Sequence, residues 1–258
     1  MKKILFLFVG LLALTASGCA SHETKSAFSA SNNDEDIVAF LDNQDAYLES
    51  ETYAAQIISD PLEGWNRSIF YINDGIITFV VRPVHGTYTA LTHEDVRTGI
   101  GNVFTNLLFP VRFVNNLLQG KGREAGQEFG KFIINSTAGL GGFINYTGLN
   151  HPELAKLDSE DFGQTLGIWG LGEGCYLYWP FLGPSSARDT VGAIGDWAAD
   201  PLTWLRPNWV TWPVKGLRTI NELDSLLDVY DTVTKSAIEP YTAVRDAYIQ
   251  YRRAKIEK

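Results

Sequence analysis

The sequence predicts a mainly α-helical protein made of short, interrupted amphipathic helices. Three observations predict this class: apolar residues recur at helical spacing, proline and glycine repeatedly interrupt those stretches, and only residues 176–179 have the character of a strand. After residue 60 no stretch approaches the roughly 20 uninterrupted apolar residues that a transmembrane helix requires. We therefore expect a flat or ring-shaped body that lies in one leaflet of a membrane.

The N-terminus has the parts of a secretory signal peptide. Two lysines follow the initiator methionine, residues 4–14 are apolar, and small residues lead to Cys19. This pattern resembles a lipoprotein processing site, so residues 1–18 are predicted to be removed and Cys19 to carry acyl chains that anchor it. The alternative is plain secretion with an unmodified Cys19. Ala20 is not aspartate, which in Gram-negative lipoproteins favours outer-membrane sorting.

Residues 19–59 are predicted to form an acidic, flexible tether. From residue 20 to residue 60 nine acidic side chains face only Lys25, so much of the formal net charge of −9 lies there. Such a polar, weakly periodic composition does not support a packed core. Nucleic-acid binding needs a basic surface, so a nucleic-acid partner is not expected. Residues 60–258 are expected to form a single helical domain.

The body begins with a helix-capping pattern. Asp60 is expected to cap a helix whose first residue is Pro61, with Glu63 completing a capping box. Apolar residues follow on two opposite faces, and Pro83 is expected to end the helix. Two apolar faces fit burial on both sides in a core, and equally one face against lipid.

Later helices are bounded by similar signals. Thr92 begins a second capping pattern, Pro110 interrupts the helix that follows, and Gly120 ends its continuation. The last two helices are expected to run from Pro213 to about residue 237 and onward from Glu239. In the helix that begins at Pro213, the residues that face inward are predicted to be 217, 220, 223 and 227.

A loop rich in glycine follows the middle helices and closes at His151-Pro152. It lacks the Lys-Ser/Thr ending of a phosphate-binding loop. Glycine permits tight turns and movement, while the apolar side chains of this loop favour an apolar surrounding. We therefore expect a hinged loop with a conformational role.

Four tryptophans lie among prolines between residues 197 and 213. Tryptophan is enriched where one side of a protein is apolar and the other wet, as at a bilayer interface. The alternative is a set of core tryptophans in proline-rich turns. The sequence alone leaves the two interpretations open for Trp197, Trp204, Trp209 and Trp212.

No catalytic or metal-binding motif is present. The sequence contains no HExxH, CxxC or GxSxG pattern. Ser185 is expected to cap a helix rather than to act with Asp189 in a hydrolase, and the acidic residues 158–161 to stabilise a helix N-terminus. Cys175 is expected to be buried and inert. We therefore predict no catalytic residues, no metal and no cofactor, and a protein that is not an enzyme.

Several motifs together resemble one family. They are Asp60-Pro61-Leu62-Glu63-Gly64-Trp65-Asn66-Arg67, residues 106–110, Asn116-Leu117-Leu118-Gln119-Gly120, Asn135-Ser136-Thr137, residues 139–144, Phe162-Gly163-Gln164-Thr165-Leu166-Gly167, Gly183-Pro184-Ser185 and Arg188-Asp189. In this order, over about residues 60–251 and with the processing site, they resemble the MlaA/VacJ lipoproteins. Trp65 replaces a Phe that is common in the family, and Cys175 replaces a frequent Pro.

The resemblance implies a doughnut-shaped helical protein in the inner leaflet of the outer membrane, around a central amphipathic channel. Phospholipid from the outer leaflet would be the transported ligand. The partners would be a trimeric porin and a soluble periplasmic lipid-binding protein.

The resemblance also assigns roles to particular residues. A hairpin loop that controls the channel would contain Gly139, Gly141, Gly142, Phe143, Ile144, Asn145 and Gly148. Asn73-Asp74 would belong to a helix whose integrity keeps the channel gated. Lys215 would lie near a basic position that lines the channel.

Two other functions remain as alternatives. One is an adaptor lipoprotein that docks porins or other envelope proteins without moving lipid. The other is a lipid-modifying enzyme such as a phospholipase. Following labelled phospholipid in vesicles separates the three, because only transport delivers intact lipid to a carrier.

Overall fold

The computed structural model describes residues 60–155 and 157–257. The predicted signal peptide, residues 1–18, the acylated Cys19 and the tether, residues 19–59, lie outside the described residues. The elements in chain order are α4 (Glu63–Ile76), η1 (Ile77–Val81), α5 (Arg82–Leu91), α6 (Glu94–Leu107), α7 (Phe109–Leu118), α8 (Gly122–Thr137), α9 (Tyr146–Asn150), α10 (Pro152–Ala155), α11 (Phe162–Ile168), β1 (Tyr176–Trp179), β2 (Gly183–Ser186), α12 (Ala187–Ala199), η2 (Pro201–Thr203), α13 (Asn208–Lys235) and α14 (Pro240–Ile256).

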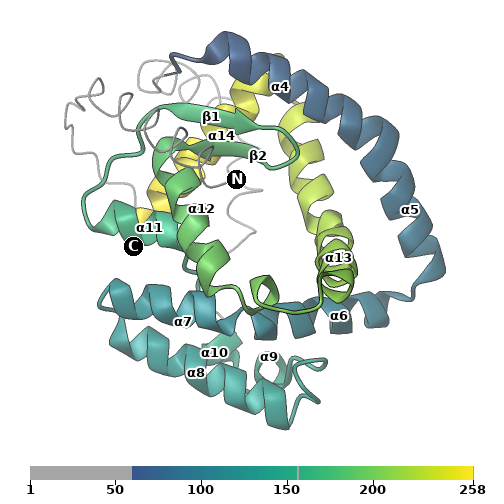
Figure 1. Ribbon diagram of the computed structural model, residues 1–258, viewed down its shortest axis with the longest axis vertical. Coiled ribbons are helices and arrows are strands. Elements are labelled where there is room, and N and C mark those ends of the chain that lie inside the picture. The colour runs from purple at the N-terminus through teal and green to yellow at the C-terminus, as the bar shows by residue number, and fades with distance from the viewer. Residues whose placement is uncertain (1–59, 156, 258) are drawn as a thin grey trace.

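The helices are arranged as a ring. Figure 1 shows α4, η1 and α5 as one long arc along one side, with α6, α7 and α8 at the bottom and α12 beside the β1–β2 hairpin on the other side. The mainly helical class is confirmed, and the hairpin is the one sheet of the described residues. Among those residues, each helix is too short or too polar to cross a bilayer.

The first helix does not end at Pro83. Proline lacks an N–H donor and its ring crowds the carbonyl four residues earlier, here that of Phe79. Residues 77–81 form the π-helical turn η1, which widens the helix directly before the proline. The chain therefore continues as α5 to Leu91, and the prediction of a helix end at Pro83 was wrong.

The expected capping box at the start of this helix is also absent. Leu62 is the N-cap residue of α4 and makes no side-chain capping bond. The Asp60 carboxylate instead accepts hydrogen bonds from Asn66 Nδ2, at 2.8 Å, and from the Tyr241 hydroxyl on α14. Asp60 therefore bonds to side chains of α4 and α14 instead of capping the helix, and it joins the two ends of the domain.

Other boundaries moved by a few residues. His93, rather than Thr92, caps α6 by accepting from Asp95 N. Ser185 lies in β2, and its neighbour Ser186 caps α12 by accepting from Asp189 N at 3.1 Å. α13 begins at Asn208, so Pro213, the expected first residue, lies inside the helix. No residue of α13 is fully buried, and Leu217 is exposed.

Several sequence predictions hold. The helix breaks at Leu108, so Pro110 lies in the first turn of α7, and Gly120 follows α7 with a φ of +77°, the left-handed conformation that ends helices. β1 covers the predicted strand and pairs antiparallel with β2, Tyr176 opposite Ser186. Asp161 caps α11 by accepting from Gln164 N at 2.8 Å.

The small core is aromatic. It forms where α4 and α14 meet β1, around Phe70, Tyr176, Tyr178, Tyr241 and Ile249. The Phe70 ring meets those of Tyr178 and Tyr241 edge to face, with centroids 5.6 Å and 5.8 Å apart. This core fixes one end of the ring, and the far end at α8 lies outside it.

Candidate functional site

The distribution of polar and apolar side chains is inverted. Among the described residues 37 large hydrophobic side chains are exposed and only 11 hydrophobic residues are buried, whereas 16 buried residues are polar or charged. Soluble domains bury charged residues rarely, and only with partners. A surface that exposes so much apolar area is suited to contact with lipid or with another apolar surface.

The tryptophans that the sequence left open are on the surface. Trp197, Trp204, Trp209 and Trp212 expose 57% to 76% of their area. They lie where α12 ends and α13 begins, and the rings of Trp197 and Trp204 are 6.4 Å apart. This excludes the core interpretation and leaves an aromatic patch of the kind that seats at a bilayer interface.

The glycine loop, residues 139–148, is fixed at its base by Asn135 of α8. The Asn135 carbonyl accepts from Gly142 N at 2.8 Å, and its buried side-chain Oδ1 accepts from Thr147 N at 3.0 Å. A Cβ at Gly139 would stand 2.2 Å from the Ile144 carbonyl oxygen, so only glycine fits there. The loop therefore has a defined base and not a random course.

The upper part of the glycine loop lies against α6. The Phe143 ring covers Gly99, and Gly142 approaches Asn106 so closely that an added Cβ would lie 2.6 Å from the Asn106 Cβ. Gly142 also has a φ of +95°, which disfavours any side chain. Leu140, by contrast, points outward and is 72% exposed. The loop thus joins α6 to the outer apolar surface.

Asn73 and Asp74, the predicted gating pair, join α4 to other parts of the ring. Asn73 Nδ2 donates to the Trp179 carbonyl at 2.9 Å, and its Oδ1 accepts from Phe181 N at 3.0 Å. The neighbouring Asp74 accepts from the Tyr230 hydroxyl of α13 at 2.7 Å. Both residues therefore hold the arc of α4 and α5 in place.

Asn66 repeats this arrangement two turns earlier. Its amide donates to the Tyr176 carbonyl at 3.0 Å and accepts from Tyr178 N at 2.8 Å. Seven residues span about two helical turns, so Asn66 and Asn73 lie on one face of α4. The two side chains supply the hydrogen bonds that a neighbouring strand would give to β1 and the turn after it.

A polar stripe runs along α6. Its members are three or four residues apart and line two pockets; they are Glu94, Arg97, Thr98, Gly101, Asn102, Thr105 and Asn106. Asn102 lines both pockets. The first, of about 50 Å³, lies between α6 and α8, and we call it the α6–α8 pocket. The second, of about 240 Å³, lies between α6 and α13, and we call it the α6–α13 pocket.

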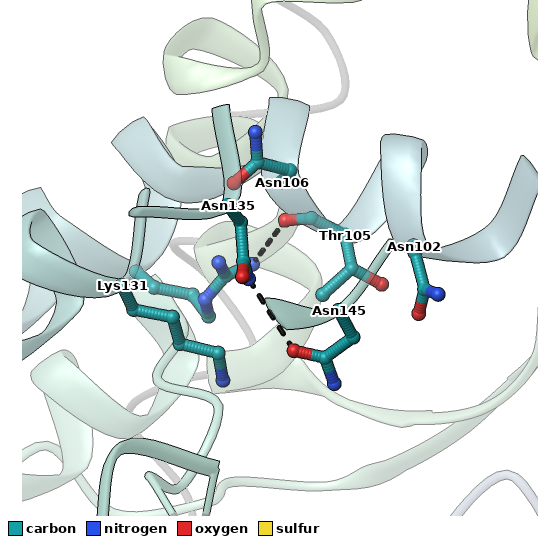
Figure 2. A pocket seen from close by; sticks show the side chains of 7 residues that line it. Asn102, Thr105, Asn106, Lys131, Asn135 and Asn145 are labelled. Atoms are coloured by element: carbon teal, nitrogen blue, oxygen red, sulfur yellow. Dashed lines mark hydrogen bonds between the residues drawn. The ribbon is translucent and has the colours of Figure 1, made fainter. Parts of the chain in front are cut away.

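The α6–α8 pocket brings the predicted loop residue Asn145 to residues that sequence analysis missed. Figure 2 shows Asn145, Lys131 and Asn135 beside Asn102, Thr105 and Asn106. Arg112 completes the lining and pairs with Glu128, Nε to Oε2, at 3.0 Å. The signal was present in the sequence, because the polar residues of α6 recur at helical spacing on the face opposite its apolar stripe.

Lys215 does not reach either pocket. It lies on α13, and its Nζ is 3.3 Å from Thr203 Oγ1 of η2. It is half-buried, and in the part of the chain that is described its ammonium forms no hydrogen bond or ion pair with the glycine loop or the gating pair. Its role in a channel stays a prediction.

The groups considered for catalysis have structural roles. Ser185 Oγ lies 3.0 Å from Thr190 Oγ1, a hydroxyl that cannot serve as a base. Asp189 sits between Arg188 and Arg252, with N–O distances of 2.9 Å and 3.0 Å. Cys175 is half-buried, not fully buried as predicted, and its carbonyl accepts from Ala187 N.

Together, the ring of short helices, the apolar exterior and the polar interior define a class of protein built for an apolar surrounding. A family model described as MlaA lipoprotein matches residues 58–255. The chain belongs to the MlaA lipoprotein family.

Individual relatives agree with this membership. The intermembrane phospholipid transport system lipoprotein MlaA of Escherichia coli K12 is 34% identical over 196 residues, which cover 74% of this chain and 76% of that protein. The protein of the same description from Haemophilus influenzae is 30% identical, with 77% and 79% covered. A solved structure, reported for the maintenance of bacterial outer membrane lipid asymmetry, has a TM-score of 0.65 and 32% identity; the match covers 77% of this chain and 99% of the solved one.

Proposed function

We propose that this protein is the outer-membrane component of a phospholipid transport system that maintains lipid asymmetry. It would take mislocalised phospholipids from the outer leaflet and pass them through a channel to a soluble periplasmic lipid-binding protein. The inverted surface carries the proposal, because an apolar exterior and a polar interior are what a body seated in lipid needs to shelter a headgroup. The names of the Escherichia coli and Haemophilus influenzae relatives support it.

The polar stripe of α6 supplies the chemistry that such a passage requires. A phospholipid headgroup cannot cross hydrocarbon cheaply unless polar groups replace its water. Along α6, Arg97, Asn102 and Thr105 offer such groups, while the acyl tails remain against the exposed apolar side chains. No covalent bond changes in this process. The net direction of flux would come from the partners, since a passive channel only equilibrates lipid.

Three further features complete the proposal. Acyl chains on Cys19 would anchor the protein, and residues 19–59 would tether it. The glycine loop would open and close the passage, while Asn73 and Asp74 keep α4 in the position that closes it. A trimeric porin would be the outer-membrane partner, and Lys215 would add a positive charge to the channel.

Vesicle reconstitution tests the proposal. The acylated full-length protein is placed in vesicles that contain labelled phospholipid, and a purified periplasmic lipid carrier is added outside. We expect intact labelled lipid on the carrier only when the protein is present. Cleaved lipid would contradict the proposal in favour of an enzyme. No transfer by a correctly inserted protein would contradict it in favour of an adaptor.

A polar-to-apolar variant refines this test. Asn102→Leu removes the amide shared by both pockets, so transfer should slow by about tenfold or more if headgroups pass along α6. Asn208→Leu is the matched control, because Asn208 is exposed at the start of α13. Equal transfer by both variants would show that headgroups take another route.

A further inference from the structure

The α6–α8 pocket carries a positive charge that the described residues do not neutralise. Arg112 and Lys131 line it, and Glu128 is the carboxylate beside them. One glutamate against two cations leaves a net charge of about +1, and the other lining groups are amides and a hydroxyl. Glu128 Oε2 accepts from Arg112, which also donates to the Thr105 carbonyl at 2.9 Å, and Glu128 Oε1 has no hydrogen-bond partner among the described residues.

Several hydrogen-bond donors of this pocket form no hydrogen bond within residues 60–155 and 157–257, and two of them lie on α8 and on the glycine loop. One is the Lys131 ammonium, which makes no ion pair or hydrogen bond there. The other is Asn145 Nδ2, whose partner atom Oδ1 accepts from Gly148 N and Thr147 Oγ1. Burial lowers the pKa of Lys131 below its usual value, against the attraction of Glu128. A half-buried cation without a partner is costly, so this pocket is suited to receive an anion.

The α6–α13 pocket differs in sign. Glu94 and Asp224 outnumber Arg97 there, and Arg97 already lies 3.5 Å from the Asp224 carboxylate. Its net charge of about −1 does not favour an anion. The positive charge is therefore specific to the pocket beneath the glycine loop and is not a general property of the α6 stripe.

The size of the α6–α8 pocket limits the ligand. A cavity of about 50 Å³ compares with the roughly 10–15 Å³ that one water needs, so it holds a group of a few heavy atoms and excludes an acyl chain. Amide and ammonium donors around a compact anion are typical of phosphate recognition. Sulfate-sized and phosphate-sized groups fit this description, and phospholipids carry the latter.

We propose that Lys131 and Asn145 bind a phosphate group in the α6–α8 pocket. Its source would be the headgroup of a glycerophospholipid, a step that rests on the proposed function, or free phosphate. Asn145 belongs to the glycine loop, Lys131 to α8 and Asn102 to α6, where Asn102 Nδ2 already donates to the Phe143 carbonyl at 3.2 Å. A bound phosphate would therefore bridge the loop to both helices, and its arrival would favour one position of the loop.

Binding measurements on the full-length protein in maltoside micelles test the site. Three probes are titrated by calorimetry: dihexanoyl phosphatidylglycerol, dihexanoylglycerol with the same tails and no phosphate, and inorganic phosphate. We expect the phospholipid to bind at least about tenfold more tightly than dihexanoylglycerol, and Lys131→Gln to remove that difference. Lys131→Arg should retain it. Lys235→Gln, which removes an exposed ammonium from α13, should leave it unchanged.

Inorganic phosphate separates the two sources. If inorganic phosphate competes with the phospholipid, and this competition is lost in Lys131→Gln, the site accepts phosphate from either source. Lys131-dependent lipid binding without competition would assign the site to the headgroup. Equal affinities in wild type and Lys131→Gln, or an equal loss of dihexanoylglycerol binding, would overturn the proposal.

Lipid transfer to the carrier, measured on the same preparations, keeps this inference apart from the proposed function. If the wild type transfers lipid and Lys131→Gln recognises phosphate as well as the wild type does, the phosphate site is rejected and the proposed transport function stands. If phosphate recognition depends on Lys131 but no lipid is transferred, the phosphate site stands and the proposed transport function is rejected.

Discussion

The ring of Phe143 lies against Gly99 so closely that a Cβ at position 99 would stand 2.3 Å from the ring. Real Cβ atoms do not approach a carbon that closely, so any side chain at position 99 displaces the ring or the loop that carries it. Gly99 is buried in the middle of α6, and Phe143 belongs to the glycine loop. The contact therefore ties the position of the loop to the shape of one helix face.

Gly99→Ala should release the glycine loop. The methyl group pushes Phe143 off α6, while alanine itself favours the helix by up to about 1 kcal/mol. We expect cells with this variant to become more sensitive to detergent at an unchanged level of the protein. Gly126→Ala on α8 is the control, since a Cβ there meets nothing within 4 Å. Equal sensitivity of the two strains would count against a gating role for the loop.

Asn73→Ala should destabilise the protein strongly. It removes the amide that bonds both the Trp179 carbonyl and Phe181 N, and each hydrogen bond of this kind contributes about 0.5–1.5 kcal/mol. Guanidinium unfolding in nonionic detergent, followed by tryptophan fluorescence, should show a loss of about 1–3 kcal/mol in the free energy of unfolding. Ser68→Ala on the exposed side of α4 should change the free energy of unfolding by less than about 0.5 kcal/mol. A loss of that smaller size for Asn73→Ala would contradict a stabilising role for the hydrogen bonds of Asn73.

Deletion of Asn73 and Asp74 should act through geometry rather than unfolding alone. Removing two residues rotates the chain after them by about 200° relative to Asn66, which keeps its own bonds to β1. η1 and α5 would then leave their places in the arc of Figure 1. We expect outer-membrane permeability to detergent to change while the protein still accumulates. Unchanged permeability at a normal protein level would argue against a gating function for this helix.

The sequence could predict the helical class, the helix break near Pro110 and the strand at 176–179, because the spacing of apolar residues and the positions of proline and glycine determine them. It could not predict that α4 continues into α5, because the π turn before Pro83 has no local signature. Nor could it pair Asn66 with a strand more than a hundred residues away. Asp60 looked like a cap for the same reason: its tertiary partner, Tyr241, lies at the opposite end of the chain.

The candidate site was predicted only in part. The glycine loop was identified from its composition, and the structure places Asn145 in a pocket. Lys131 and Asn102 were missed because the apolar residues of α6 and α8 are the ones that indicate the buried face of a helix in a soluble protein. In a protein with an apolar exterior, the polar side of an amphipathic helix is the one that faces inward, which reverses the usual interpretation.

Cys19→Ser should detach the protein from its anchor. Without acylation at Cys19, only the exposed tryptophans and the other exposed apolar side chains would bind the protein to the membrane. Fractionation of cells should show the variant lost from the outer membrane or retained with an uncleaved leader, and labelled palmitate should be absent from it. Ser17→Ala, two residues earlier, keeps the small residue before Cys19 and should remain acylated. Palmitate incorporation into Cys19→Ser would place the anchor elsewhere.

The pH dependence of stability should be set in part by Asp196 of α12. Burial raises the pKa of its carboxyl to about 6, and the charge of Asp161 adds to this, while hydrogen bonds from Phe162 N and Asn115 Nδ2 oppose it. Because the pKa is higher in the folded state, the folded protein binds the proton more readily between pH 4 and 6. The free energy of unfolding should therefore fall as pH rises through that range, by about 2 kcal/mol.

Asp189 should set the acid limit of the same profile. Its side chain is buried, which alone would raise the pKa, but Arg188 and Arg252 hold the pKa at about 2. A depressed folded-state pKa contributes stability above about pH 4 that is lost as pH falls toward 2. Together the two carboxyl groups place the maximum of stability near pH 4, which guanidinium unfolding at a series of pH values would locate.

Asp196→Asn separates the two contributions. The asparagine Oδ1 can still accept from Phe162 N, so the variant should match the wild type near pH 4 and exceed it at pH 6 by about 2 kcal/mol. Its profile between pH 4 and 6 should be nearly flat, with the acid limb from Asp189 unchanged. Asp228→Asn, on the exposed side of α13, removes the same charge and should leave the wild-type slope intact. A fall in stability between pH 4 and 6 that survives in Asp196→Asn would assign it to another group.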